Sequence, residues 1–277
     1  MSQWKPVGSL DPRSLVEPRL QLHYALLTLA SVAASLIPKR PDWSHGSVDF
    51  DPEGNRFLGQ PLAGGMRAVL AVEGLEISLL DDGGSSVGAK SLFGSTLQQG
   101  HEWFKTTIGA RGIDVAGFRE QKFGDFPEHA LDSGAAFDAS QQAGIREVAL
   151  YFENTMRYLQ ELTLRDKRAS AIRLWPHHCD IATLITIKEP SEPGGEDGQS
   201  VGVGFSPGDG GTPEPYWYVT PWPYPDPATL PALAAGRWNT DGWVGAVLES
   251  SSLSKEVDTQ REQTHGFLDA AVGALLT

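Results

Sequence analysis

The segment Arg173–Asp180 (RLWPHHCD) holds the densest group of residues that could do chemistry. As a strand, it places alternate side chains on opposite faces. His177 and Cys179 then share a face with the apolar run that follows, so we expect both to be buried. His178 and Asp180 share the other face, where they could anchor one ligand or act as a base and its orienting partner. The structural alternative is a plain hydrogen-bonded pair.

A metal site at this segment would need a third ligand from elsewhere in the chain. His45 lies two residues after Trp43, much as His177 lies two residues after Trp175. Imidazole and carboxylate groups are ligands that divalent metals accept in proteins. If the segment holds a metal rather than a plain hydrogen-bonded pair, we expect a divalent ion held by His45, His178 and Asp180, with Asp49 as another choice for the third ligand.

The segment 214–224 (EPYWYVTPWPY) is the second candidate. In an extended chain, one face carries Tyr216, Tyr218, Thr220, Trp222 and Tyr224. Such a row of rings could wall a pocket for a flat or cationic ligand. Pro221 and Pro223 have no N–H group, so we expect an edge strand or the exit from a strand. The structural alternative is an aromatic ladder packed against a helix.

Two motif matches fail on their chemistry. Residues 204–208 (GFSPG) fit the pattern G-x-S-x-G, in which the residue after serine donates its N–H to an oxyanion. Pro207 has no such N–H, so this site lacks its main stabilising donor. Residues 202–208 also lack the third glycine of a dinucleotide-binding fingerprint. The sequence favours neither a serine hydrolase nor a nucleotide cofactor.

The net charge and the length of the longest apolar run limit the classes of partner that this chain can bind. The 277 residues include 22 Lys and Arg against 35 Asp and Glu, a net charge of −13. This balance argues against nucleic acid and against an anionic membrane surface. The longest apolar run, 25–37, is about half as long as a membrane span and has the spacing of an amphipathic helix packed on a core. We therefore expect a cytoplasmic protein with a small-molecule partner; the sequence does not indicate an oligomeric state.

Apolar periodicity predicts helices near 18–37, 95–110, 140–165 and 254–275. Short strands are expected within 44–80 and at 171–187, 201–205, 216–222 and 243–248, and the glycine-rich segment 111–135 is expected to form loops. Ser95 and Gln98 have the form of a capping box. The order predicts an α+β fold, with a mostly antiparallel sheet and long packed helices. We place an N-terminal half at 1–130 and a C-terminal half at 131–277. Both halves set a long helix before a tryptophan–histidine segment, so two similar halves stay an open alternative.

Three segments of the C-terminal half resemble the signature segments of an uncharacterised bacterial family, described only as a domain of unknown function. They are LWPHHCDIAT (174–183), GVGFSPGDGGTPEPYWYVTPWPYP (202–225) and GWVGAVL (242–248). The resemblance covers residues 170–250, with Cys179 at a position where an aromatic residue is expected. Because the family has no established activity, the resemblance implies only that the three segments form one site or one core.

Two functions follow as hypotheses. The first is a small-molecule-binding protein with His178 and Asp180 as polar anchors. Its pocket would be walled by Tyr216, Tyr218, Trp222, Tyr224 and Trp243. The second is a metal-dependent enzyme, hydrolase-like, that uses His45 with the same two anchors as metal ligands. A stoichiometric metal in the purified protein would distinguish the second from the first.

Overall fold

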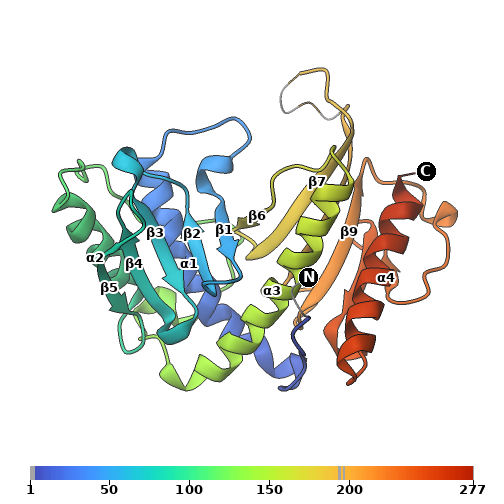
Figure 1. The fold of residues 1–277 in the computed structure, drawn as a ribbon, viewed down its shortest axis with the longest axis horizontal. Helices are drawn as coiled ribbons and strands as arrows, with labels where there is room; N and C mark the ends of the chain where they lie inside the picture. Colours follow the sequence, from blue (N-terminus) through green and yellow to red (C-terminus); the bar gives the residue numbers. More distant parts are fainter. Residues whose placement is uncertain (1–3, 193–194, 196, 277) are drawn as a thin grey trace. The chain divides into compact units, whose positions relative to one another are not determined.

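The computed structural model describes residues 4–192, 195 and 197–276. Long helices and antiparallel strands make up the fold (Figure 1), which confirms the predicted α+β class. The α-helices are α1 (Val16–Leu36), α2 (Leu97–Gly109), α3 (Gln142–Arg165) and α4 (Val257–Leu275). The strands are β1 (Val48–Asp51), β2 (Arg56–Gly59), β3 (Arg67–Ala71), β4 (Glu76–Leu80), β5 (Ser86–Ser91), β6 (Arg173–Trp175), β7 (Asp180–Lys188), β8 (Gln199–Ser206), β9 (Tyr216–Trp222), β10 (Arg237–Asn239) and β11 (Gly245–Glu249).

The chain divides into two compact units that are not consecutive stretches of sequence. Unit 1 consists of Met1–Leu15, Leu150–Arg173 and Asp180–Thr277, and unit 2 of Val16–Ala149 and Leu174–Cys179. Helix α3 therefore begins in unit 2 and continues in unit 1. The predicted boundary between residues 130 and 131, and the similarity of the two halves, stay predictions.

Unit 2 is built on an antiparallel sheet with the strand order β6-β1-β2-β3-β4-β5, and α1 and α2 pack on it (Figure 1). Residues 21–33 of α1 are buried around the whole circumference. The prediction of an amphipathic helix is therefore wrong for this stretch, because strands, α2 and the segment 119–127 all contact it. None of the helices among the described residues is both long enough and apolar enough to cross a membrane.

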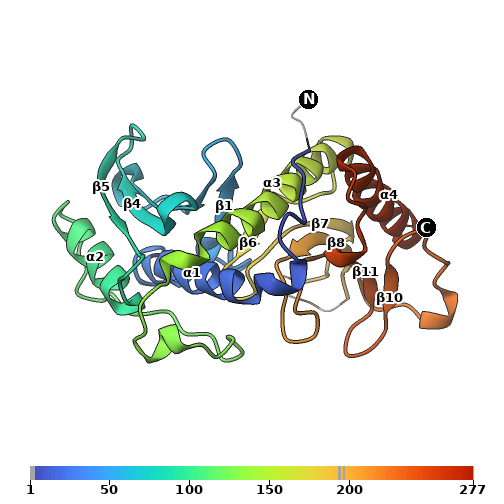
Figure 2. The same cartoon turned by 90° about the horizontal axis from the view of Figure 1, so that it is seen from below.

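Unit 1 has an antiparallel sheet in the order β10-β11-β9-β8-β7, with α4 and the second part of α3 on one face (Figure 2). Trp217 points into this core, where its Nε1 donates a hydrogen bond to Thr155 Oγ1 at 2.8 Å. Phe205 stacks on Tyr151 with ring centroids 5.7 Å apart. These contacts bury the odd-numbered residues of β9 and leave its even-numbered residues on the other face of the sheet.

Strand β9 lies between β8 and β11, so the prediction of an edge strand is wrong. The prolines fit because the two neighbours differ in length. Strand β8 pairs with β9 from Tyr216 to Trp222, whereas β11 pairs only with Tyr216–Val219. Pro221 lies beyond the end of the β11 ladder, and its missing N–H interrupts no bond there. Only the expectation of a strand exit agrees with the observed end at Trp222.

Helix α2 begins with a capping box one residue later than predicted. Thr96 Oγ1 accepts a hydrogen bond from Gln99 N at 3.2 Å, and Gln99 Oε1 accepts one from Thr96 N at 2.9 Å. Ser95 instead directs its hydroxyl to the carbonyl of Ser91 at 3.4 Å. Both neighbouring pairs fit the sequence motif, so the sequence alone does not distinguish them.

We predict that Thr96→Ala lowers the free energy of unfolding by about 1 kcal/mol, because it leaves an N-terminal amide of α2 without its acceptor. Urea unfolding measures this change. Ser95→Ala is the matched control and should cost less, since the Ser95 hydroxyl makes only a long hydrogen bond. A larger loss for Ser95→Ala than for Thr96→Ala would contradict the assigned cap.

Candidate functional site

The predicted histidine strand is interrupted by a turn. Strand β6 ends at Trp175, residues 176–179 form a turn, and β7 begins at Asp180. Cys179 has a left-handed backbone with φ 57°, which breaks the alternation of faces on which the prediction depended. Cys179 is buried as predicted, but His177 is only half-buried and His178 is exposed. The expected burial of His177 is therefore wrong.

The two predicted anchors belong to different units and have different surroundings. His178 lies in the turn of unit 2, with its ring 4.2 Å from that of His177. Asp180 lies at the start of β7 in unit 1, where its Oδ2 accepts a hydrogen bond from Tyr218 Oη at 2.5 Å. A joint role for His178 and Asp180 stays a prediction.

The predicted metal ligands are not gathered into a site. Within the described ranges, no group of three or more His, Cys, Asp or Glu side chains is placed to hold a metal ion. His45 is buried, and its Nδ1 accepts a hydrogen bond from the Arg40 amide at 3.2 Å. The ring of Trp43 lies 5.7 Å from that of His45. These contacts give His45 a structural role in the turn that precedes β1.

The aromatic residues of β9 alternate as predicted, but they differ in exposure. Tyr216 is buried and Tyr218 is half-buried, whereas Trp222 and Tyr224 are 44% and 46% exposed. Trp243 is half-buried near the start of β11. The rings of Trp222 and Tyr224 meet edge to face, with centroids 5.7 Å apart. That these five residues wall a common pocket stays a prediction.

The hydroxyls of Tyr216 and Tyr218 are both hydrogen-bonded to carboxylates. Tyr216 Oη donates to Asp209 Oδ2 at 2.5 Å, and Tyr218 Oη donates to Asp180 Oδ2 at the same distance. Burial is the main cause that raises the pKa of both tyrosines, and the carboxylates raise it further. Tyr218 reaches Asp180 by crossing Gly204, where a Cβ would come within 2.7 Å of the hydroxyl. The glycine is needed for this close approach.

The two tryptophans of β9 give a direct test of the assigned faces. Trp217 is fully buried, so Trp217→Ala should lower the free energy of unfolding by about 3–5 kcal/mol. Trp222→Ala should cost less than about 1 kcal/mol, because nearly half of this side chain is already in solvent. Chemical denaturation compares the two variants. Equal losses would contradict the assignment.

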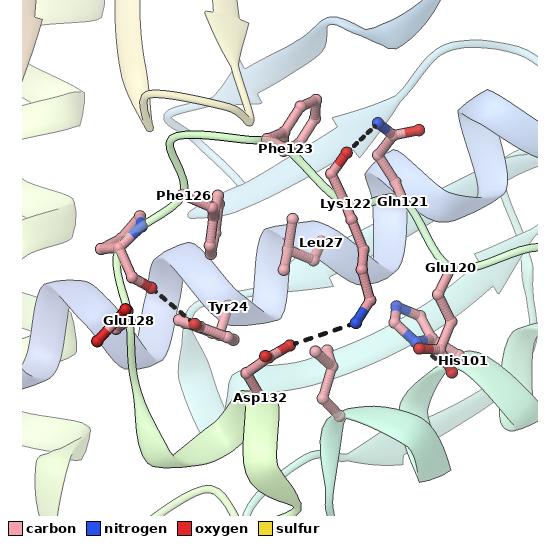
Figure 3. Close-up of a pocket in the computed structure, with 12 residues that line it drawn as sticks. Tyr24, Leu27, His101, Glu120, Gln121, Lys122, Phe123, Phe126, Glu128 and Asp132 are labelled. Atoms are coloured by element: carbon pink, nitrogen blue, oxygen red, sulfur yellow. Dashed lines mark hydrogen bonds and ion pairs between the residues drawn. The ribbon is translucent and has the colours of Figure 1, made fainter.

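A cavity of about 140 Å³ lies in unit 2, between α1, α2 and the segment 120–132 (Figure 3). Its wall combines aromatic rings with titratable side chains, a composition typical of ligand sites. It is lined by Tyr24, Leu27, Leu97, His101, Glu120, Gln121, Lys122, Phe123, Phe126, Pro127, Glu128 and Asp132. None of these residues is among the predicted site residues.

Aromatic contacts hold one wall of this cavity in place. Tyr24 Oη donates a hydrogen bond to the carbonyl of Pro127 at 2.7 Å, which fixes the loop on α1. The ring of Phe126 lies 5.0 Å from Tyr24, edge to face, and 4.2 Å from His23. Phe123 stacks on Phe126 at 6.1 Å. The loop is thus packed through its own aromatic side chains, although its sequence is rich in charged residues.

The turn 176–179 packs against the residues of this aromatic wall. His23 Nε2 donates to the carbonyl of Pro176 at 2.9 Å, and the ring of His177 lies 5.8 Å from Phe123. Burial lowers the pKa of His23 to about 3, against the raising effect of the Pro176 carbonyl. Burial also lowers the pKa of His177, with His178 adding to the shift and Asp125 opposing it. The histidine motif is therefore part of the packing around the cavity.

The opposite wall carries a buried histidine, His101, which is 2% exposed. Its Nε2 lies 3.1 Å from Ser31 Oγ, and that oxygen also accepts a hydrogen bond from the Gln121 amide at 2.9 Å. Glu120 Oε1 lies 3.5 Å from His101 Nδ1. Burial lowers the pKa of His101, and Glu120 acts in the opposite direction. Burial therefore favours the neutral imidazole.

Acidic groups outnumber basic ones at the mouth of the cavity. Lys122 Nζ lies 4.0 Å from Asp132 Oδ1, and Figure 3 shows this pair spanning the space beside Tyr24. The pKa of Tyr24 is raised first by burial and then by the charges of Asp132 and Glu128. These carboxylates make the electrostatic potential at this wall negative.

The pKa of His23 predicts a pH-dependent stability. The unfolded chain binds a proton at this residue below about pH 6.5, whereas the folded chain resists protonation down to about pH 3. The stabilisation is complete above pH 6.5 and is lost as the pH falls toward 3, at up to about 1.4 kcal/mol per pH unit. His23→Gln keeps an N–H donor for the Pro176 carbonyl. It should reduce the slope of the free energy of unfolding against pH by up to about 1.4 kcal/mol per pH unit.

Urea unfolding of wild type and His23→Gln between pH 6 and pH 4 measures this slope. His178→Gln, which replaces an exposed histidine of the supporting turn, is the control for the loss of one imidazole. A wild-type slope in His23→Gln would show that another group carries the pH dependence.

Comparison with models of protein families, with curated proteins and with solved structures gives no match for this chain. The sequence predicts loops for the segment 111–135 and indicates no function there. The available signal was the pair of phenylalanines, Phe123 and Phe126, since two large apolar side chains in a polar loop indicate that the loop packs on something.

Proposed function

We propose that this protein binds a small molecule, and that the ligand occupies the cavity between α1, α2 and the segment 120–132. One observation carries the proposal: an aromatic wall faces a buried histidine and charged groups across about 140 Å³. Apolar side chains at such a site supply binding energy, and a few polar groups orient the ligand. The chain's net charge of −13 favours a small molecule over nucleic acid as the partner.

The size of the cavity limits the ligand. An apolar cavity of about 150 Å³ holds one benzene molecule. The ligand, or the part of it that enters, therefore has one ring or a chain of roughly six to ten non-hydrogen atoms. Ligands of this size bind in about the micromolar to millimolar range, because few atoms contribute to the contact. A cytoplasmic location, expected from the composition, is part of this proposal.

The cavity replaces the aromatic face of β9 as the leading site. On that face the hydroxyls of Tyr216 and Tyr218 already bind Asp209 and Asp180. The cavity of unit 2 instead brings rings and titratable groups together around one space. The second hypothesis, a metal-dependent hydrolase, has no comparable observation in its favour, and we do not propose it.

We predict that ligand-observed NMR with a library of monocyclic compounds finds binders to the wild-type protein. Phe126→Ala should weaken binding at least about tenfold, because it removes a wall of the cavity. Leu97→Trp should do the same by filling the cavity. Thermal melting of each variant shows that the fold is retained.

Trp222→Ala is the matched control, because it alters the other aromatic surface and leaves the cavity unchanged. Binding to Trp222→Ala should equal binding to wild type. Loss of binding in Trp222→Ala, with normal binding in Phe126→Ala and Leu97→Trp, would place the ligand on β9 and overturn the proposal. Absence of any binder would overturn it as well.

A further inference from the structure

We propose that the ligand of this cavity is an organic cation, with an ammonium group on a small apolar or aromatic body. The inference rests on the proposed function and adds the chemical class of the ligand. Three separate features of the cavity carry it: the balance of charge, the aromatic rings, and a buried nitrogen that has no hydrogen bond.

The charge balance favours a positive group. The lining holds three carboxylates, Glu120, Glu128 and Asp132, against a single ammonium, that of Lys122. At pH 7 these groups sum to two negative charges. An anionic ligand would add to this repulsion, whereas a cation would relieve it.

The aromatic wall of the cavity also favours a positively charged ligand. The faces of aromatic rings carry negative potential and attract a cation within about 6 Å of the ring centre. Tyr24 and Phe126 meet at 78° with centroids 5.0 Å apart, so the two rings offer differently oriented surfaces to one ligand. Figure 3 shows Tyr24 and Phe126 at one end of the space and His101 and Glu120 at the other, with Leu27 between them. A cation with an apolar body matches this division.

His101 supplies the independent observation. Its side chain is almost completely buried and lines the cavity, yet its Nδ1 forms no hydrogen bond with any described residue. Glu120 Oε1 lies 3.5 Å away without the geometry of a hydrogen bond. A buried polar atom without a hydrogen bond is energetically unfavourable. In the tautomer whose Nε2–H donates to Ser31 Oγ, Nδ1 carries a lone pair, and a ligand ammonium could donate both to this lone pair and to Glu120.

The ammonium of Lys122 already lies beside the Asp132 carboxylate, where a ligand ammonium would bind. The two groups lie 4.0 Å apart, and the side chain of Lys122 is 75% exposed and so able to move aside. A ligand ammonium would compete with Lys122 for the Asp132 carboxylate. Removing the lysine should therefore strengthen the binding of a cation, which is a consequence that a purely hydrophobic cavity would not have.

Three probes of matched size test the inference: benzylamine, benzyl alcohol and benzoate, titrated at pH 7.5 with ligand-observed NMR. We expect benzylamine to bind about tenfold more tightly than benzyl alcohol, and benzoate most weakly. If benzyl alcohol or benzoate binds as well as benzylamine, the charge preference is wrong while the proposed function stands. If none of the three binds, both the inference and the proposed function are overturned.

Variants that each remove one charge identify the residues that cause the preference for a cation. Asp132→Asn and Glu120→Gln should weaken benzylamine binding about fivefold and leave benzyl alcohol unchanged. Lys122→Met should strengthen benzylamine binding about threefold. Asp82→Asn, at an exposed turn of the same unit, is the control for the loss of one negative charge and should leave all three probes unchanged. Equal effects of Asp82→Asn and Asp132→Asn would show only long-range attraction and would overturn the assigned site.

Discussion

The hydrogen bond from Tyr24 to the carbonyl of Pro127 is the constraint on which the cavity depends. It fixes a loop of mixed composition on the buried helix α1, and the rings of Phe123 and Phe126 then pack between the loop and the helix. The segment has no regular backbone pairing, so this bond and the bond from the Gln121 amide to Ser31 Oγ hold it on the helix. The cavity exists because the loop is fixed at its aromatic residues while its charged residues line the remaining space.

The same constraint gives the histidine motif a physical role. His23 reaches from α1 to the carbonyl of Pro176, and His177 contacts Phe123. A buried neutral histidine that donates one N–H to a carbonyl is a stable arrangement at neutral pH and an unfavourable one in acid. The turn 176–179 therefore stabilises the wall of the cavity. The resemblance of this segment to an uncharacterised family stays a prediction.

Periodicity in the sequence predicted the helices and most strands well, because those elements bury one face over many residues. Helix α3 and the alternation of Trp217 with Tyr216 and Tyr218 follow directly from it. Strands β5 and β10 were missed, since the sequences of both are largely polar. The turn at 176–179 was missed because left-handed backbone at a cysteine has no sequence signal. The cavity could not be predicted, because it arises from contacts between α1 and residues a hundred positions away.

A crystal structure of the protein soaked with benzylamine tests the central claim most directly. The account predicts that the ring of the ligand lies against Tyr24 and Phe126, with its ammonium within hydrogen-bonding distance of Asp132 or Glu120 and with Lys122 displaced from Asp132. Benzylamine bound against Trp222 and Tyr224, with the cavity unchanged and Lys122 still paired to Asp132, would contradict it.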